Sequence, residues 1–154
     1  MPRGCLTDLR HLLDDLHVSL SVRDERCAGR PLDVAFHGEL RPDQKAAANA
    51  LLAHDIGVLA ATTAFGKTVV AARLIAERRV STLVLVHRQQ LLDQWVDRLS
   101  TFLELPPSAI GRIGGGKRKP NGQLDVSLIQ SLVRKGVAGL RSLSSQASYG
   151  QASP

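Results

Sequence analysis

The chain has 154 residues, enough for one domain with its own core, and because 44% are apolar but only 3% aromatic, that core must consist of Leu, Val, Ile and Ala. A net charge of +6 favours polyanionic partners, nucleic acid first, although ordinary surface arginines explain the charge equally well. The two cysteines lack metal-ligand spacing, which argues against a zinc site or a disulfide framework and favours the cytoplasm. The charged N-terminus argues against a signal peptide, and the lack of a run of roughly 20 apolar residues argues against a membrane span.

The first 37 residues predict a short α+β segment that carries no recognisable chemical motif. Residues 6–17 have the pattern of an amphipathic helix with four leucines on one face. Residues 18–22 alternate between apolar and polar, and residues 32–36 follow after a polar stretch and Gly29. This pattern predicts two strands joined by a loop.

From residue 40 onward, helical and strand patterns alternate. Pro42 is suited to open a helix over 43–53. The elements expected after it are a buried strand at 57–61, a helix at 67–77, a strand at 82–86, a helix at 88–103, a Gly- and Lys-rich loop at 112–122, a strand at 124–129 and a helix at 130–135. Such alternation predicts an α/β domain, residues 38–140, with helices flanking a parallel sheet. Residues 141–154, rich in Ser, Gln, Ala and Gly, are predicted to be a disordered tail.

Residues 61–68 (ATTAFGKT) leave a predicted strand and enter a predicted helix, the context expected of a P-loop. There Lys67 brings a cation to the phosphates of ATP, and the Thr68 hydroxyl ligates Mg²⁺. Ala61 stands where the strict pattern has Gly, and Ala64 costs about 1 kcal/mol if its φ must be positive. A chance Gly-Lys-Thr is the alternative. The residues predicted to bind ATP here are Thr63, Ala64, Phe65, Gly66, Lys67, Thr68 and Val69.

The order of motifs resembles superfamily 2 helicases and translocases, particularly the branch with restriction-enzyme motor subunits and the UvrB-like N-terminal helicase domain. In that branch the P-loop commonly starts with Ala. Over residues 38–135 the resemblance implies a partial RecA-like P-loop NTPase lobe that uses ATP and Mg²⁺. Residues 40–44 (LRPDQ) are similar to the adenine-recognition segment of the family. Gln44 would pair with adenine and Arg41 would stack on it; the alternative is an exposed Gln at a helix start.

Three further segments resemble family motifs that touch nucleic acid, with DNA favoured over RNA. Residues 83–95 are similar to motif Ia, 114–119 to the Gly-rich motif Ib region and 127–132 to motif Ic. For the Gly-rich segment a solvated loop is an equal alternative. The residues that the resemblance assigns to the nucleic acid are Arg88, Gln89, Gly114, Gly115, Lys117, Arg118, Lys119, Gln130 and Ser131.

ATP hydrolysis in this family needs an Asp-Glu pair, and the sequence has no DExH or DExD. After Glu104 its single acid is Asp125. We therefore expect a helicase portion that ends before this motif, binds ATP without turnover, and belongs with a missing lobe or a larger parent protein. One alternative is a non-catalytic nucleic-acid-binding fragment or half of a split motor. Another is a different P-loop enzyme such as a small kinase, against which residues 83–95 and Gln44 argue.

Overall fold

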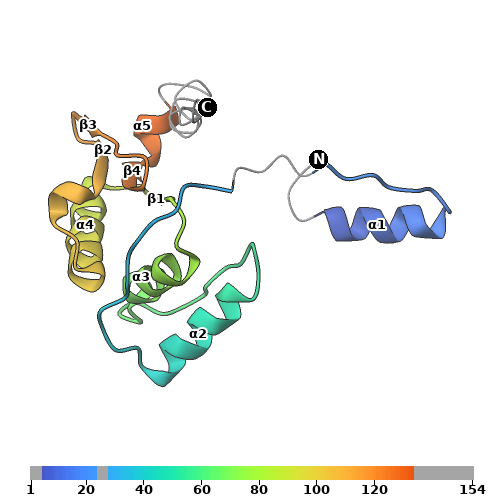
Figure 1. Ribbon diagram of the computed structural model, residues 1–154, viewed down its shortest axis with the longest axis horizontal. Coiled ribbons are helices and arrows are strands. Elements are labelled where there is room, and N and C mark those ends of the chain that lie inside the picture. Colours follow the sequence, from blue (N-terminus) through green and yellow to red (C-terminus); the bar gives the residue numbers. More distant parts are fainter. Residues whose placement is uncertain (1–4, 24–27, 134–154) are drawn as a thin grey trace, which may run out of the picture.

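The computed structural model describes residues 5–23 and 28–133, and its centre is a four-stranded sheet with helices packed beside it (Figure 1). The strand order is β1-β4-β2-β3, and the first three of these strands are mutually parallel. In the register, Val126 of β4 lies between Val84 of β1 and Arg112 of β2. This confirms the predicted α/β class with a parallel sheet. The strands are β1 (Thr82–Val86), β2 (Gly111–Gly114), β3 (Lys117–Lys119) and β4 (Leu124–Leu128).

The helices of the sheet domain lie where periodicity predicted them, to within two residues. Pro42 is the first residue of α2, where its missing N–H is no loss. A 3-10 turn, Pro107–Ala109, follows α4. None of the helices within the described ranges is long and apolar enough to cross a membrane. The tail predicted at 141–154, and the last two residues of the helix predicted at 130–135, lie outside the described residues. The helices are α2 (Pro42–Leu52), α3 (Lys67–Arg78), α4 (Gln89–Leu103) and α5 (Ile129–Val133).

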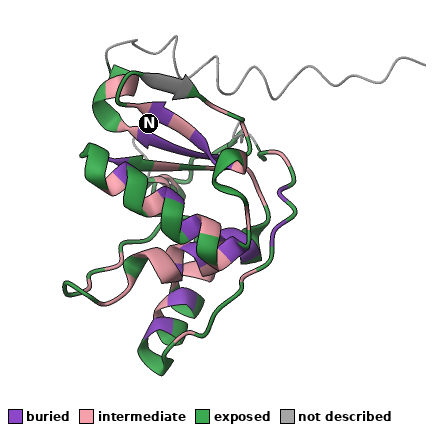
Figure 2. Cartoon of the chain, turned by 90° about the vertical axis from the view of Figure 1, so that its left-hand side faces the viewer, coloured by how far each residue is buried: buried purple, intermediate pink, exposed green. Residues whose placement is uncertain are grey.

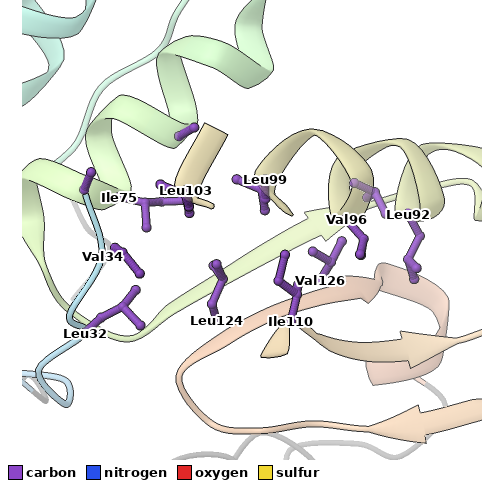
Figure 3. Packing of buried hydrophobic residues seen from close by; sticks show 13 residues of the cluster. Leu32, Val34, Ile75, Leu92, Val96, Leu99, Leu103, Ile110, Leu124 and Val126 are labelled. Atoms are coloured by element: carbon purple, nitrogen blue, oxygen red, sulfur yellow. The ribbon is translucent and has the colours of Figure 1, made fainter. Parts of the chain in front are cut away.

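The core lies between α4 and one face of the sheet (Figure 3). Strand alternation turns Val84 and Val86 toward this cluster, whereas Leu83 and Leu85 lie on the opposite face and are exposed. Figure 2 shows the buried residues in the sheet and along the helices beside it. Since β1 is also the end strand of the described sheet, it presents both an apolar face and an unpaired edge. The buried side chains that α4 contributes are Leu92, Val96, Leu99 and Leu103.

The N-terminal segment has the predicted helix but not the predicted strands. Helix α1 (Leu6–Asp15) lies apart from the sheet and from the other helices (Figure 1). Residues 18–22 form no strand, and their apolar side chains Val18, Leu20 and Val22 are exposed. An alternating segment forms a strand only where a partner strand exists, and no strand of the described part of the chain pairs with these residues.

The second predicted strand, at 32–36, is part of an extended strap (residues 28–37) that has one isolated bridge, between Pro31 and Val80, and a backbone hydrogen bond from His37 to the carbonyl of Phe102. Beside that bridge, the Leu32 amide donates to the carbonyl of Arg79. Leu32 and Val34 are buried in the core cluster. Leu32 and Val34 thus share one buried face, but residues 32–36 do not form the predicted strand of a sheet.

The strand predicted at 57–61 is also wrong. These residues have no assigned strand, and Val58 is 92% exposed. A short apolar run forms a buried parallel strand only between two neighbouring strands. The edge of β1 is unpaired in the described sheet, but residues 57–61 do not pair with it, so this segment has no neighbouring strand.

The loop predicted at 112–122 contains an antiparallel hairpin instead. Strands β2 and β3 pair with Arg112 opposite Lys119. Gly115 and Gly116 connect them with φ of 58° and 78°, the left-handed values that tight hairpin turns require. Glycine and lysine are poor strand formers, so composition concealed this hairpin.

Asp125 is buried at the start of β4 and organises the turn before it. Its carboxylate accepts hydrogen bonds from the backbone amides of Asn121 (2.8 Å) and Gly122 (3.0 Å). Gly111 leaves room for this carboxylate, because a Cβ there would lie 1.7 Å from Oδ1. The single acid after Glu104 therefore serves the fold.

Replacing Asp125 with asparagine should lower the free energy of unfolding by about 1–3 kcal/mol, because an amide nitrogen would face a backbone N–H donor. Urea denaturation measures this. Asp97→Asn, on the exposed side of α4, should change stability by less than about 0.5 kcal/mol. Equal effects of the two substitutions would contradict the structural role of Asp125.

Candidate functional site

The turn from Thr62 to Gly66 leads directly into α3. The carbonyl of Thr62 accepts from the amide of Phe65 (3.4 Å), and that of Gly66 accepts from the amides of Val69 (2.9 Å) and Val70 (3.2 Å). Gly66 is the N-cap of α3. The first amides of a helix lack partners within the helix and, together with its dipole, favour a bound anion. The turn therefore presents donors suited to phosphate.

Two residues of this turn have left-handed backbone conformations. Gly66 has φ of 89° and Ala64 has φ of 65°. The sequence predicted a cost at Ala64 only if its φ is positive, and its φ is positive here. Alanine therefore costs about 1 kcal/mol at this position relative to glycine. The strain lies at the centre of the phosphate loop.

Lys67 is the first residue of α3, and its exposed side chain folds back over the turn. Its Nζ donates to the carbonyl of Thr62 at 2.8 Å. Thr68 follows as the second residue of α3. The loop thus gathers a cation, a hydroxyl and helix N-terminal amides, the groups that bind the phosphates of a nucleotide and an associated Mg²⁺.

Arg41 and Gln44, at the start of α2, both reach the carbonyl of Phe65. Arg41 Nη2 donates to it at 2.9 Å and Gln44 Nε2 at 2.7 Å. The structure therefore brings the two predicted adenine-binding residues against the phosphate loop. Sequence reasoning missed this contact, because no sequence pattern marks a backbone carbonyl as the shared acceptor.

Arg41 has two further contacts. Its guanidinium lies 5.9 Å from the centre of the Phe65 ring, within cation–π range. Its Nε also lies 3.3 Å from Oδ1 of Asp43. Hydrogen bonding to the Arg41 guanidinium holds the pKa of Asp43 below its usual value. Arg41 is thus fixed beside the loop while much of its side chain remains exposed.

A cavity of about 350 Å³ lies beside α3, and Lys67 is among its lining residues. The end of α2 forms another wall, held to α3 by Arg78, whose Nη2 donates to the carbonyls of Leu51 and His54. Leu59, from the segment predicted as a strand, lines it as well. The cavity is thus bounded partly by the residues that lack a sheet partner.

The carboxyl ends of three parallel strands form a second cluster. Gln130, just after β4, donates from Nε2 to the carbonyl of His87, just after β1, at 3.0 Å. Gln89, the first residue of α4, lies against the β2–β3 turn, since a Cβ on Gly115 would come within 2.5 Å of its Oε1. The exposed Arg88 is the N-cap of α4. The structure thus brings together predicted nucleic-acid residues from three separate segments.

The remaining predicted residues lie near this cluster or beyond what is described. Gly114 ends β2, Lys119 is exposed in β3, and Ser131 is half-buried in α5. Lys117 and Arg118 belong to β3, but their side chains are outside the described part of the structure. Sequence reasoning assigned no site role to Arg112, whose Nη1 lies 3.4 Å from Asp93 and links the hairpin to α4.

The described ranges contain no group of three or more Asp, Glu, His or Cys side chains that could hold a metal ion. Asp125 lies near the start of β4, whereas the strand-end cluster lies at the carboxyl ends of the strands. Asp125 and the strand-end cluster therefore lie at opposite ends of the sheet.

A family model described as "Type III restriction enzyme, res subunit" matches residues 37–151. The chain belongs to this family, abbreviated ResIII. The matched range contains the phosphate loop and every strand of the described sheet. The parallel α/β arrangement is that of a partial RecA-like lobe, and the family match supports the predicted resemblance to the N-terminal lobe of superfamily 2 helicases.

Two curated relatives are similar over part of the chain. The "DNA 3'-5' translocase XPB2" of Sulfurisphaera tokodaii is 37% identical over 79 residues, 51% of this chain. The "Putative DNA 3'-5' helicase Rad25" of Halobacterium salinarum is 35% identical over 100 residues, 64% of this chain. The matched segment covers 17% of each relative. This ResIII-family chain therefore corresponds to a small portion of these proteins.

Proposed function

We propose that this ResIII-family chain is the ATP-binding and DNA-contacting portion of a DNA helicase or translocase. The observation that carries the proposal is the phosphate loop, where a strained turn, the start of α3 and the Lys67 ammonium lie together. Both named relatives are described as acting on DNA, which supports DNA as the polymer.

ATP is proposed to bind with its phosphates on residues 63–69. Backbone amides at the start of α3 and the Lys67 ammonium would contact phosphate oxygens. The Thr68 hydroxyl would supply one oxygen ligand to Mg²⁺, whose other ligands are phosphate oxygens and water. The exposed Arg41, which lies beside Phe65, would stack on the base.

Hydrolysis is proposed to need acids that the described residues do not supply. The sequence contains no DExH or DExD motif, and Asp125 is committed to backbone amides. The 154-residue chain should bind ATP with no more than background turnover. An ATPase assay with and without single-stranded DNA tests this, and robust DNA-stimulated turnover would overturn it.

DNA is proposed to lie across the strand-end cluster, with its backbone near Arg88 and the start of α4. Helix N-termini and arginines bind phosphates without reading sequence. The Gln130–His87 hydrogen bond and the Gln89–Gly115 contact hold the three segments of this surface together. Binding should therefore depend strongly on salt and weakly on sequence.

Arg88→Ala should raise the Kd for single-stranded DNA by about 3- to 10-fold near 0.1 M salt and reduce the salt slope by roughly 0.7. Fluorescence anisotropy with a labelled oligonucleotide measures both quantities. Arg98→Ala is the matched control, because Arg98 is exposed on the same helix away from the strand ends. Equal losses in both variants would mean that only net charge matters, and would refute the assigned surface.

A further inference from the structure

The carboxylate of Asp93, on α4, accepts hydrogen bonds from two side chains, one on each oxygen. Nη1 of Arg112 lies 3.4 Å from Oδ1, and Nε2 of Gln89 lies 3.4 Å from Oδ2. Gln89 and Asp93 are four residues apart on α4 and so lie on the same side of that helix, whereas Arg112 belongs to β2. Asp93 therefore joins α4 to the β2–β3 hairpin.

These contacts reach both ends of the hairpin. Arg112 pairs with Lys119 at the open end, and Gly115 lies in the turn. Oε1 of Gln89 packs against that turn so closely that a Cβ on Gly115 would lie 2.5 Å from it. Through Arg112 and Gln89, Asp93 thus braces the open end and the turn of the hairpin against one helix.

The turn of the hairpin needs this support because it extends past the part of the sheet that pairs. Strand β2 pairs with β4 only from Gly111 to Ile113, and in the described part of the chain β3 pairs only with β2. Residues 114–117 therefore lie beyond the last pair with β4. Contacts with α4 then limit how far the turn can move away from the strand-end cluster.

The charge of Asp93 has the opposite sign to that of the cations that bind DNA. Its side chain is 51% exposed, on the helix that Arg88 caps. A carboxylate there would repel phosphates, so electrostatics alone predicts that its removal tightens DNA binding. A brace predicts the opposite result, because its loss would displace the basic residues at 117–119 of the hairpin.

We infer that Asp93 is a positioning residue for DNA binding, which holds the β2–β3 hairpin against α4 through Arg112 and Gln89 and does not itself contact DNA. This inference rests on the proposed binding of DNA at the strand-end cluster. The hairpin would present its basic residues to the phosphates at a fixed angle to Arg88. An exposed ion pair is individually weak, so a single substitution should change the affinity by a small factor.

Asp93→Ala should raise the Kd for single-stranded DNA about threefold at about 0.1 M salt, although it makes the chain more positive. It should also reduce the salt slope by roughly 0.7 for each phosphate contact that the hairpin loses. Asp97→Ala is the matched control, because it removes the same charge from an exposed position one turn along α4, and its Kd should be unchanged or up to about twofold lower. Fluorescence anisotropy with a labelled oligonucleotide measures both quantities. An unchanged or lower Kd for Asp93→Ala would overturn the inference.

Amide hydrogen exchange tests the brace without DNA. In Asp93→Ala, the amides of residues 112–119 should exchange about fivefold faster, while those of β1 stay unchanged. Unaltered rates in residues 112–119 would overturn the inference. If the unaltered chain binds no DNA, the proposed function fails, but this measurement still decides the role of Asp93.

Reversing the ion pair provides a rescue. Asp93→Arg combined with Arg112→Asp keeps the net charge and places opposite charges at the same two positions. The exchange rates of residues 112–119 should return to within about twofold of the unaltered chain. Rates as fast as those of Asp93→Ala would show that the pair does not hold the hairpin, and would contradict the inference. If circular dichroism shows that Asp93→Ala unfolds, Asp93→Asn replaces it in both measurements.

Discussion

Replacing Lys67 with alanine is expected to raise the Kd for ATP by about 10- to 100-fold. A hydrogen bond between charged groups contributes about 1.5–3 kcal/mol, and each 1.4 kcal/mol corresponds to a factor of ten in affinity. Lys67 is exposed, and its hydrogen bond to the Thr62 carbonyl lies within the loop, so the fold should tolerate the change. Isothermal titration calorimetry measures the affinity, and thermal unfolding checks that the chain is intact.

Lys45→Ala is the matched control for this experiment. Lys45 is exposed on α2, and its replacement removes the same charge without changing the phosphate loop. Its Kd for ATP should stay within about twofold of the unaltered chain. If both lysine variants bind equally well, the loop from Thr62 to Thr68 is not a phosphate site, and the proposed function is wrong.

Replacing Leu99 with alanine is expected to lower the free energy of unfolding by about 3–4 kcal/mol. Leu99 is fully buried in the middle of α4, and truncating it removes apolar contacts and leaves a cavity over the sheet. For a domain of this size, such a loss lowers the Tm by roughly 15 °C. Thermal and urea denaturation followed by circular dichroism measure it.

Leu12→Ala provides the comparison, because Leu12 is 56% exposed on α1. Its effect should stay below about 0.5 kcal/mol. A small effect at Leu99 would show that α4 does not form the core with β4 in solution. A large effect at Leu12 would show instead that the exposed face of α1 is covered.

Elements with a regular apolar period or a short apolar run were mostly predictable. Helix α4 was predicted because its apolar spacing has the helical period, and β1 because five apolar or β-branched residues stand between turn signals. The segment 57–61 has the same kind of pattern as β1 but is no strand. A strand needs a neighbour, and sequence alone does not say which neighbours are present.

The candidate site was likewise predictable only in part. A Gly-Lys-Thr before a helix predicts a phosphate loop, because the chemistry needs those residues consecutively. The contact between Gln44 and the Phe65 carbonyl joins residues 21 positions apart through a backbone atom. The assignment of Gln44 to adenine came from family resemblance, and only the geometry showed that its amide already has two partners.

The sequence by itself determined the helical and strand periods and the family, and it predicted the phosphate loop, because these depend on residue types at short, regular spacing. The tertiary structure decided which apolar runs became strands, that residues 28–37 pack as a strap, and that Asp125 is structural. It also brought Gln130 to His87 and Gln89 to Gly115. Those outcomes depend on burial and on partners distant in the chain, which local residue patterns do not encode.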